Sequence, residues 1–189
     1  MRRALFGGTF DPIHNAHLTV AREAAGVFGL DQVLFIPAAN PPHKPDSTAA
    51  SFEDRFRMVE LACEADPRFI PSRLEEGKGR SYSILTIEKL WSPGQPLYFI
   101  IGADAFAEIK TWRRWEEVVR LTDFIVVTRP GHIYDAPPGA RVHRLDTLAL
   151  PVSSSEIRTK LSKGEIPAEL PSQVAEFIVQ RRLYTWDML

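Results

Sequence analysis

The stretch of sequence that decides the fold runs from residue 3 to residue 18 and reads RALFGGTFDPIHNAHL. Its first part, Arg3 to Gly7, is a short apolar run typical of a buried β-strand. After a turn, apolar residues recur at spacings of three and four from about Asn15 to Gly29, which predicts an amphipathic helix that stops at the glycine. A strand that leads through a short turn into a helix is the first half of a βαβ unit.

The same alternation continues along the chain. We expect further strands over residues 32–37, 69–70, 97–101, 124–127 and about 142–145. We expect further helices from Ser51, over 83–91, and over two closing segments at about 154–162 and 172–182. Strands that alternate with helices at roughly 30-residue intervals predict an α/β fold with a doubly wound parallel sheet. We interpret residues 1–189 as a single domain, with a Rossmann-like core over about 1–150 and a small C-terminal helical subdomain over about 151–189.

The composition excludes several classes of partner and location. The 23 Lys and Arg residues nearly balance the 24 Asp and Glu residues, so the net charge is −1, and proteins that bind nucleic acid usually carry a marked basic excess. The longest apolar run, residues 97–103, is far shorter than the roughly 20 residues of a membrane helix. The single cysteine, Cys63, cannot form an internal disulfide, which favours a reducing compartment. We expect a cytoplasmic protein that binds neither nucleic acid nor membrane.

Chemistry in a doubly wound sheet is expected at the carboxyl ends of the strands, where helices begin. After the first strand, Gly7 and Gly8 permit a tight turn and a close approach of a ligand. The helix that begins near Asn15 offers free N–H groups to a phosphate, and His14 and His17 lie on one side of its first turn. A zinc site built on the two histidines is an alternative, although no third ligand is evident. Neither a G-x-G-x-x-G fingerprint nor a P-loop is present, so a phosphate would be held differently.

Residues 8–17, GTFDPIHNAH, resemble the signature of the nucleotidyltransferase superfamily with a His-x-Gly-His motif, and the longer GGTFDPIH form resembles that of the bacterial nicotinate-nucleotide adenylyltransferases. Other segments that resemble motifs of this family follow in order, namely PPHK at 41–44, SYSILT at 81–86, GAD at 102–104 with Trp112 and Trp115 beyond it, RPG at 129–131, VSSSEIR at 152–158 and the closing segment 174–184. One position departs from the pattern. Ala16 stands where glycine is usual, and its methyl group favours the helix but crowds a nucleotide that lies close to the backbone.

The resemblance implies a Rossmann-like nucleotidyltransferase fold and a specific reaction. The 5′-phosphate of nicotinate mononucleotide would attack the α-phosphorus of ATP, in line with the leaving pyrophosphate, to give deamido-NAD. Because the second pKa of a phosphate monoester is about 6, the nucleophile is mostly ionised at neutral pH and needs no general base. A Mg²⁺ ion would accompany ATP, held mainly by phosphates and water, so no metal-ligating residues are expected.

Cations and helix starts must offset the repulsion between two polyanions. We count His17 at the α-phosphate, His14 at the β- and γ-phosphates, Arg158 on the triphosphate tail and Lys44 between both substrates as the catalytic set. The ATP-binding set further contains Gly7, Gly8, Thr9, Phe10, Ser154 and Ser155, where Ser154 is expected to cap its helix. The acceptor-binding set contains Thr9, Lys44, Ser83, Thr86, Asp104 and Trp112.

Within the acceptor set, Trp112 is expected to stack on the cationic pyridinium ring, and Trp115 to pack in the core. Asp104 is expected to bind ribose hydroxyls, or else to cap the segment after its strand. Hydrogen-bond donors such as the Thr86 hydroxyl and backbone N–H groups near Ser83 and Glu108 would favour the acid over the amide, because a carboxylate only accepts hydrogen bonds.

Three alternatives stay open from the sequence. The acceptor could be nicotinamide mononucleotide or phosphopantetheine, or the chain could be a nucleotide-binding module without catalysis. Phosphopantetheine-using relatives are usually shorter and lack the tryptophan pair and the PPHK segment. The retained His14, His17, Lys44 and Arg158 disfavour a mere binding module. Self-association into a homo-oligomer is expected from the resemblance alone.

Overall fold

A computed structural model describes residues 1–39, 48–77, 80–128, 133–147 and 152–184. Six strands form one sheet in the order β3-β2-β1-β4-β5-β6, and every neighbouring pair is parallel. The strands are β1 (Arg3–Gly8), β2 (Gln32–Pro37), β3 (Phe69–Pro71), β4 (Leu97–Gly102), β5 (Asp123–Thr128) and β6 (Arg141–Asp146). This order confirms the doubly wound parallel sheet predicted from the alternating pattern.

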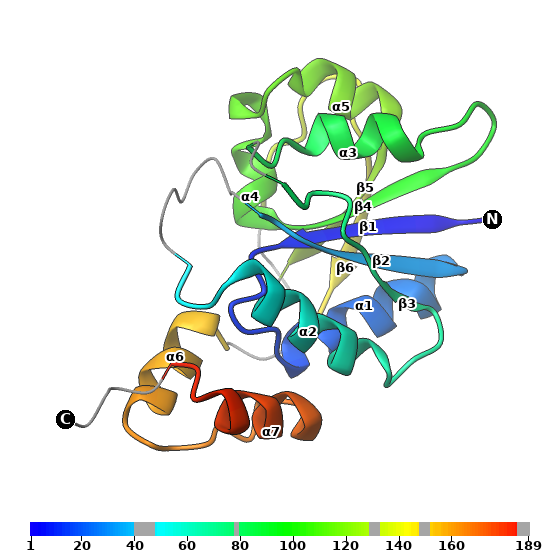
Figure 1. The fold of residues 1–189 in the computed structure, drawn as a ribbon. Coiled ribbons are helices and arrows are strands. Elements are labelled where there is room, and N and C mark those ends of the chain that lie inside the picture. Colours follow the sequence, from blue (N-terminus) through cyan, green and yellow to red (C-terminus); the bar gives the residue numbers. More distant parts are fainter. Residues whose placement is uncertain (40–47, 78–79, 129–132, 148–151, 185–189) are drawn as a thin grey trace.

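Helices cover both faces of the sheet (Figure 1). Their bounds are α1 (Asn15–Phe28), α2 (Phe52–Cys63), α3 (Ser83–Leu90), α4 (Ala103–Ala107), α5 (Trp115–Leu121), α6 (Ser154–Ser162) and α7 (Ser172–Arg181), with a short 3₁₀ helix, η1, at Ile109–Thr111. Residues of α1, α2, α6 and α7 share one apolar cluster with one face of the sheet, and those of α3, α4 and α5 share a second cluster with the other face. The two closing helices therefore pack onto the core through the same apolar cluster as α1.

Local signals explain where the helices begin and end. Gly29 takes the left-handed conformation, with φ of 58°, and ends α1 as predicted. Ser51 caps α2 by accepting a hydrogen bond from the Asp54 N–H. None of the helices in the described ranges has the length and apolar character that crossing a bilayer requires.

The segment between β4 and β5 differs most from the sequence expectation. It contains three short helical pieces, α4, η1 and α5, where the apolar pattern predicted no helix with definite bounds. Trp112 ends η1 with extended backbone, and Trp115 opens α5. Pieces of three to seven residues are too short for a helical periodicity to be read from apolar spacing.

Candidate active site

Four cavities that share lining residues run along the carboxyl ends of the strands. The histidine cavity has a volume of about 660 Å³, and its lining includes His14, His17, Asp104, Ser153 and Ser154. The Arg158 cavity has a volume of about 590 Å³, and its lining includes Thr9, Phe10, His17, Ser154, Ser155 and Arg158. The Thr86 cavity has a volume of about 330 Å³, and its lining includes Gly7, Gly8, Thr9, Glu75 and Thr86. The Arg113 cavity has a volume of about 710 Å³, and its lining includes Arg80, Tyr82, Glu108, Thr111 and Arg113. Thr9 joins the Arg158 and Thr86 cavities, and Ser81, Ser83, Ala105 and Trp112 join the Thr86 and Arg113 cavities. Together they form one cleft.

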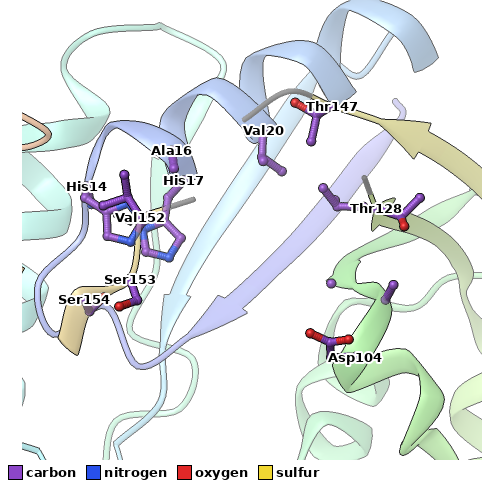
Figure 2. Close-up of a pocket in the computed structure, with 13 residues that line it drawn as sticks. His14, Ala16, His17, Val20, Asp104, Thr128, Thr147, Val152, Ser153 and Ser154 are labelled. Carbon is purple, nitrogen blue, oxygen red and sulfur yellow. Dashed lines mark hydrogen bonds between the residues drawn. The ribbon is translucent and has the colours of Figure 1, made fainter. Parts of the chain in front are cut away.

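The two histidines at the start of α1 both line the histidine cavity. Their rings stack with centroids 3.8 Å apart and an angle of 29° between planes. The backbone N–H of His14 donates to Nδ1 of His17 at 3.2 Å. Because Nδ1 accepts, the proton of a neutral His17 ring is on Nε2 and is available as a donor. Figure 2 shows the histidine pair beside Ser153 and Ser154, with Asp104 on the opposite side of the cavity.

Burial makes both rings neutral in the ligand-free protein. It lowers the pKa of His14 to about 4, with the Glu169 carboxylate opposing the shift. Burial also lowers the pKa of His17 well below its usual value, and the neighbouring His14 adds to this. Both residues were expected to be cations, and their burial corrects this expectation. At neutral pH they are uncharged hydrogen-bond donors until an anion next to them raises their pKa.

The turn between β1 and α1 forms the floor of the cleft. A side chain in place of Gly8 would crowd the turn, because its Cβ would lie 3.0 Å from the ring of the buried Phe10. Phe10 is buried, has a φ of 49°, and meets the His17 ring edge-on with centroids 5.1 Å apart. Gly7 and Thr9 line the Thr86 cavity. The turn therefore supports His17 from below and carries Thr9 at the junction of two cavities.

The start of α6 packs against this turn, and the two together line the Arg158 cavity. Its N-cap is Ser153, which accepts from the Glu156 N–H, so the expectation that Ser154 caps the helix was wrong. Ser154 is the first helical residue, and its hydroxyl donates to the Pro12 carbonyl at 3.0 Å. Nη1 of Arg158 donates to the Asp11 carbonyl at 2.7 Å, which uses one of five guanidinium N–H groups and holds the side chain at the Arg158 cavity.

A buried network of polar groups, none of them expected as site residues from the sequence, packs against the turn. The Asp11 carboxylate, 2 % exposed, accepts hydrogen bonds from the N–H groups of Ala49 and Ala50 and from the Tyr184 hydroxyl. Arg55, 1 % exposed, donates to the Thr9 carbonyl at 2.6 Å. Burial lowers the pKa of Arg55 and the Asp11 carboxylate opposes that shift. A charged residue on the otherwise apolar side of α2 was the one signal in the sequence that pointed to this network.

On the other side of the cleft, the Thr86 hydroxyl is already engaged. Thr86 is buried and its hydroxyl donates to the Glu75 carboxylate at 2.8 Å. Its single proton therefore points at Glu75 and not at a ligand, contrary to the donor role expected from the sequence. Burial raises the pKa of Glu75, and hydrogen bonds from Thr86 and Ser81 oppose the shift.

Three further residues of the predicted acceptor set, Trp112, Ser83 and Asp104, are divided between two parts of the cleft. Trp112 lines both the Thr86 and Arg113 cavities and packs edge-to-face on Phe99, with centroids 5.6 Å apart. Ser83 also lines both. Asp104 instead lines the histidine cavity, across from His14 (Figure 2). Lys44 and the rest of the PPHK segment, and the RPG segment at 129–131, lie outside the described residues.

Comparisons with known proteins agree with this geometry. Residues 5–160 match the family model described as cytidylyltransferase-like. The chain is 58 % identical to the probable nicotinate-nucleotide adenylyltransferase of Solibacter usitatus, over 97 % of this chain and 100 % of that protein. It is 41 % identical to the protein of the same name from Salinispora arenicola, over 94 % and 98 % of the two chains. The chain belongs to the nicotinate-nucleotide adenylyltransferase family.

The fold agrees with a solved structure of distant sequence. Plasmodium falciparum nicotinic acid mononucleotide adenylyltransferase complexed with NaAD superposes with a TM-score of 0.78 at 22 % identity, over 97 % of each chain. In this chain, Ala16 occupies the position of the glycine in the His-x-Gly-His motif. Ala16 is 8 % exposed, and its methyl group lines the histidine cavity. The departure from glycine therefore lies at the wall of the proposed nucleotide site.

Proposed function

We propose that the chain transfers the adenylyl group of ATP to nicotinate mononucleotide, giving deamido-NAD and pyrophosphate. One observation carries the assignment of the two substrates. The cleft has stacked histidines and a helix start at one end and a tryptophan-lined cavity at the other, with Thr9 between them. This order suits the adenylyl donor at the histidine end and the pyridine nucleotide at the tryptophan end.

The reaction requires positioning and charge stabilisation more than covalent chemistry. The acceptor phosphate, already ionised, attacks the α-phosphorus as the bond to the pyrophosphate oxygen breaks in line. Negative charge moves onto the leaving pyrophosphate. We assign Nε2–H of His17 to the α-phosphate, and His14 and Arg158 to the β- and γ-phosphates. The N–H groups at the start of α6 add neutral donors.

Because both histidines are neutral without ligand, a bound triphosphate would change their protonation. A cation waiting in an empty buried cavity would be unfavourable, because burial disfavours the charged form. A bound triphosphate reverses that balance, so each ring gains basicity only when its ligand is present. We propose that ATP binding is accompanied by proton uptake at the histidine pair.

We propose Mg²⁺ as the divalent ion that accompanies ATP. No cluster of three His, Cys, Asp or Glu side chains that could hold a metal is found in the described part of the chain. Asp104 supplies one carboxylate at the histidine cavity. A single carboxylate with phosphate oxygens and water is a donor set that Mg²⁺ accepts. The ion would neutralise charge on the triphosphate, and Asp104 would orient the ATP that carries the ion.

Pyrophosphate release tests the proposal directly. The purified protein is incubated with ATP and Mg²⁺ and with nicotinate mononucleotide, nicotinamide mononucleotide or phosphopantetheine in turn. We expect the fastest release with nicotinate mononucleotide and formation of deamido-NAD. Faster release with either other acceptor would replace the substrate assignment, and no release with any of the three would overturn the enzyme assignment. Omitting the divalent ion should abolish release.

We also propose a cytoplasmic location and a homo-oligomer. The location is supported by the single cysteine, Cys63, which is buried and whose thiol has a pKa raised to about 12 by burial. A reducing compartment suits such a thiol. The homo-oligomer rests on the family resemblance, and sedimentation velocity would test it.

A further inference from the structure

The Arg113 cavity carries positive charge that no role assigned above uses. It is lined by Arg80 and Arg113 together with one carboxylate, that of Glu108. Neither arginine forms an ion pair with another residue of the described ranges. The neighbouring Arg114 is a clear contrast, because it pairs with both Glu88 and Glu117.

Arg113 is held at this cavity by an aromatic contact. Its guanidinium lies over the Tyr82 ring, 4.8 Å from the ring centroid. A guanidinium stacked on a ring keeps its N–H groups in the plane free for an anion, and its planar fork matches a carboxylate. Trp112, which lines the same cavity, is the residue proposed to stack on the pyridine ring.

The opposite wall next to Trp112 has the reverse electrostatic character. The one charged residue lining the Thr86 cavity in the described ranges is Glu75, whose carboxylate accepts a hydrogen bond from the Thr86 hydroxyl. A substrate carboxylate placed there would face a carboxyl group and an oxygen that has no proton to donate. Among the described residues, an acidic substituent on a ring stacked on Trp112 therefore meets positively charged side chains toward the Arg113 cavity and not toward the Thr86 cavity.

We propose that Arg113 is the residue that selects the acid over the amide, by binding the carboxylate of the pyridine ring through its guanidinium, with Arg80 adding positive charge. The inference rests on the proposed function, because it requires a pyridine mononucleotide in this part of the cleft. The amide of nicotinamide carries no charge, so it gains much less from the same arginine.

Arg113→Gln tests this proposal. We expect the ratio of kcat/KM for nicotinate mononucleotide to that for nicotinamide mononucleotide to fall about tenfold, mostly through a higher KM for the acid. A tenfold change corresponds to about 1.4 kcal/mol, close to the lower limit for a hydrogen bond to a charged group. The KM for ATP and the kcat for the acid should change less than about twofold. Arg113→Lys keeps the charge without the planar fork and should restore part of the ratio.

Arg114→Gln is the matched control, since it removes the same charge one residue along the chain from a side chain paired elsewhere. It should leave the acid-to-amide ratio unchanged. If the wild-type protein uses the acid but Arg113→Gln keeps the wild-type ratio within twofold, the inference is overturned and the proposed function stands. If the wild-type protein uses neither mononucleotide, the proposed function itself has failed. Because Arg113 is exposed, thermal unfolding of the variant should match that of the wild type.

Discussion

The two ends of the cleft are built from opposite kinds of side chain. At the histidine end, His14 and the groups that hold the turn are buried, with His14 4 % exposed, Asp11 2 % and Arg55 1 %, while His17 and Arg158 are half-buried. At the Arg113 end, Arg80, Glu108 and Arg113 are exposed. Groups that stabilise charge in a reaction act best when they are fixed beforehand in a site without water, whereas recognition of a substituent tolerates an exposed side chain. We therefore assign the rate of the reaction to the histidine end of the cleft and the choice of acceptor to the Arg113 end.

The largest effect is expected from His17→Ala. Loss of the Nε2–H donor should lower turnover about 10² to 10³-fold, as the loss of one well-placed donor does elsewhere. The KM for nicotinate mononucleotide should change little. Pyrophosphate release under saturating substrates measures this. His143→Ala is the control, because His143 pairs with Asp123 at the start of β5, at the other end of the strand. Normal turnover in His17→Ala would break the assignment of rate to the histidine end.

Burial of His14 also predicts a pH dependence of stability. Since burial lowers the pKa of His14 from 6.5 to about 4, the unfolded chain binds more protons between these values. The contribution of the buried, neutral His14 to the free energy of unfolding is therefore fully present above about pH 6.5 and is lost as the pH falls toward 4. Between pH 7.5 and pH 5, the free energy of unfolding of the wild type should fall by about 2 kcal/mol more than that of His14→Asn. This follows from about 1.4 kcal/mol for each pH unit below 6.5. Urea unfolding at both pH values measures it, and equal losses in the two proteins would contradict a buried neutral His14.

Trp112→Ala tests whether the Arg113 end of the cleft binds the acceptor. Loss of the stacking face should raise the KM for nicotinate mononucleotide about tenfold, because a cation on a desolvated tryptophan gains about 1–2 kcal/mol. The KM for ATP should stay within twofold. Trp91→Ala is the control, since Trp91 follows α3 and is 41 % exposed. Equal increases in both KM values would show that Trp112 supports the fold and not the acceptor.

The smallest effect is expected from Ala16→Gly, which restores the family's usual residue. Removal of the methyl group from the histidine cavity should lower the KM for ATP a few-fold. The same change should lower the free energy of unfolding by less than about 1 kcal/mol, because glycine is the poorer helix former. Ala21→Gly changes a buried α1 residue that does not line the cavity and should affect stability alone. An unchanged KM in Ala16→Gly would show that the methyl group does not crowd the nucleotide.

Much of the fold follows from apolar runs in the sequence. Leu97–Gly102 and Gln32–Pro37 are almost fully buried, and such runs stand out against their polar flanks. The short pieces between β4 and β5 did not stand out, because a helix of five or seven residues shows hardly two turns of periodicity. The turn carrying His14 and His17 was found through its unusual string of residues.

The parts of the site that depend on contacts across the chain could not be read from the sequence. Arg55 reaches the Thr9 carbonyl, and Tyr184 reaches the Asp11 carboxylate from the far end of the chain. The protonation of the histidines follows from burial, which only the packed structure defines. Arg113 looks like an ordinary surface arginine until Tyr82 and Trp112 are placed beside it.

A crystal structure of the protein with deamido-NAD bound is the measurement that tests this division of the cleft most directly. We predict that the phosphates of the dinucleotide lie between Thr9 and His17, with the pyridine ring against Trp112 and its carboxylate at Arg113. A pyridine ring in the histidine cavity, or an adenine ring against Trp112, would contradict the assignment of the two ends.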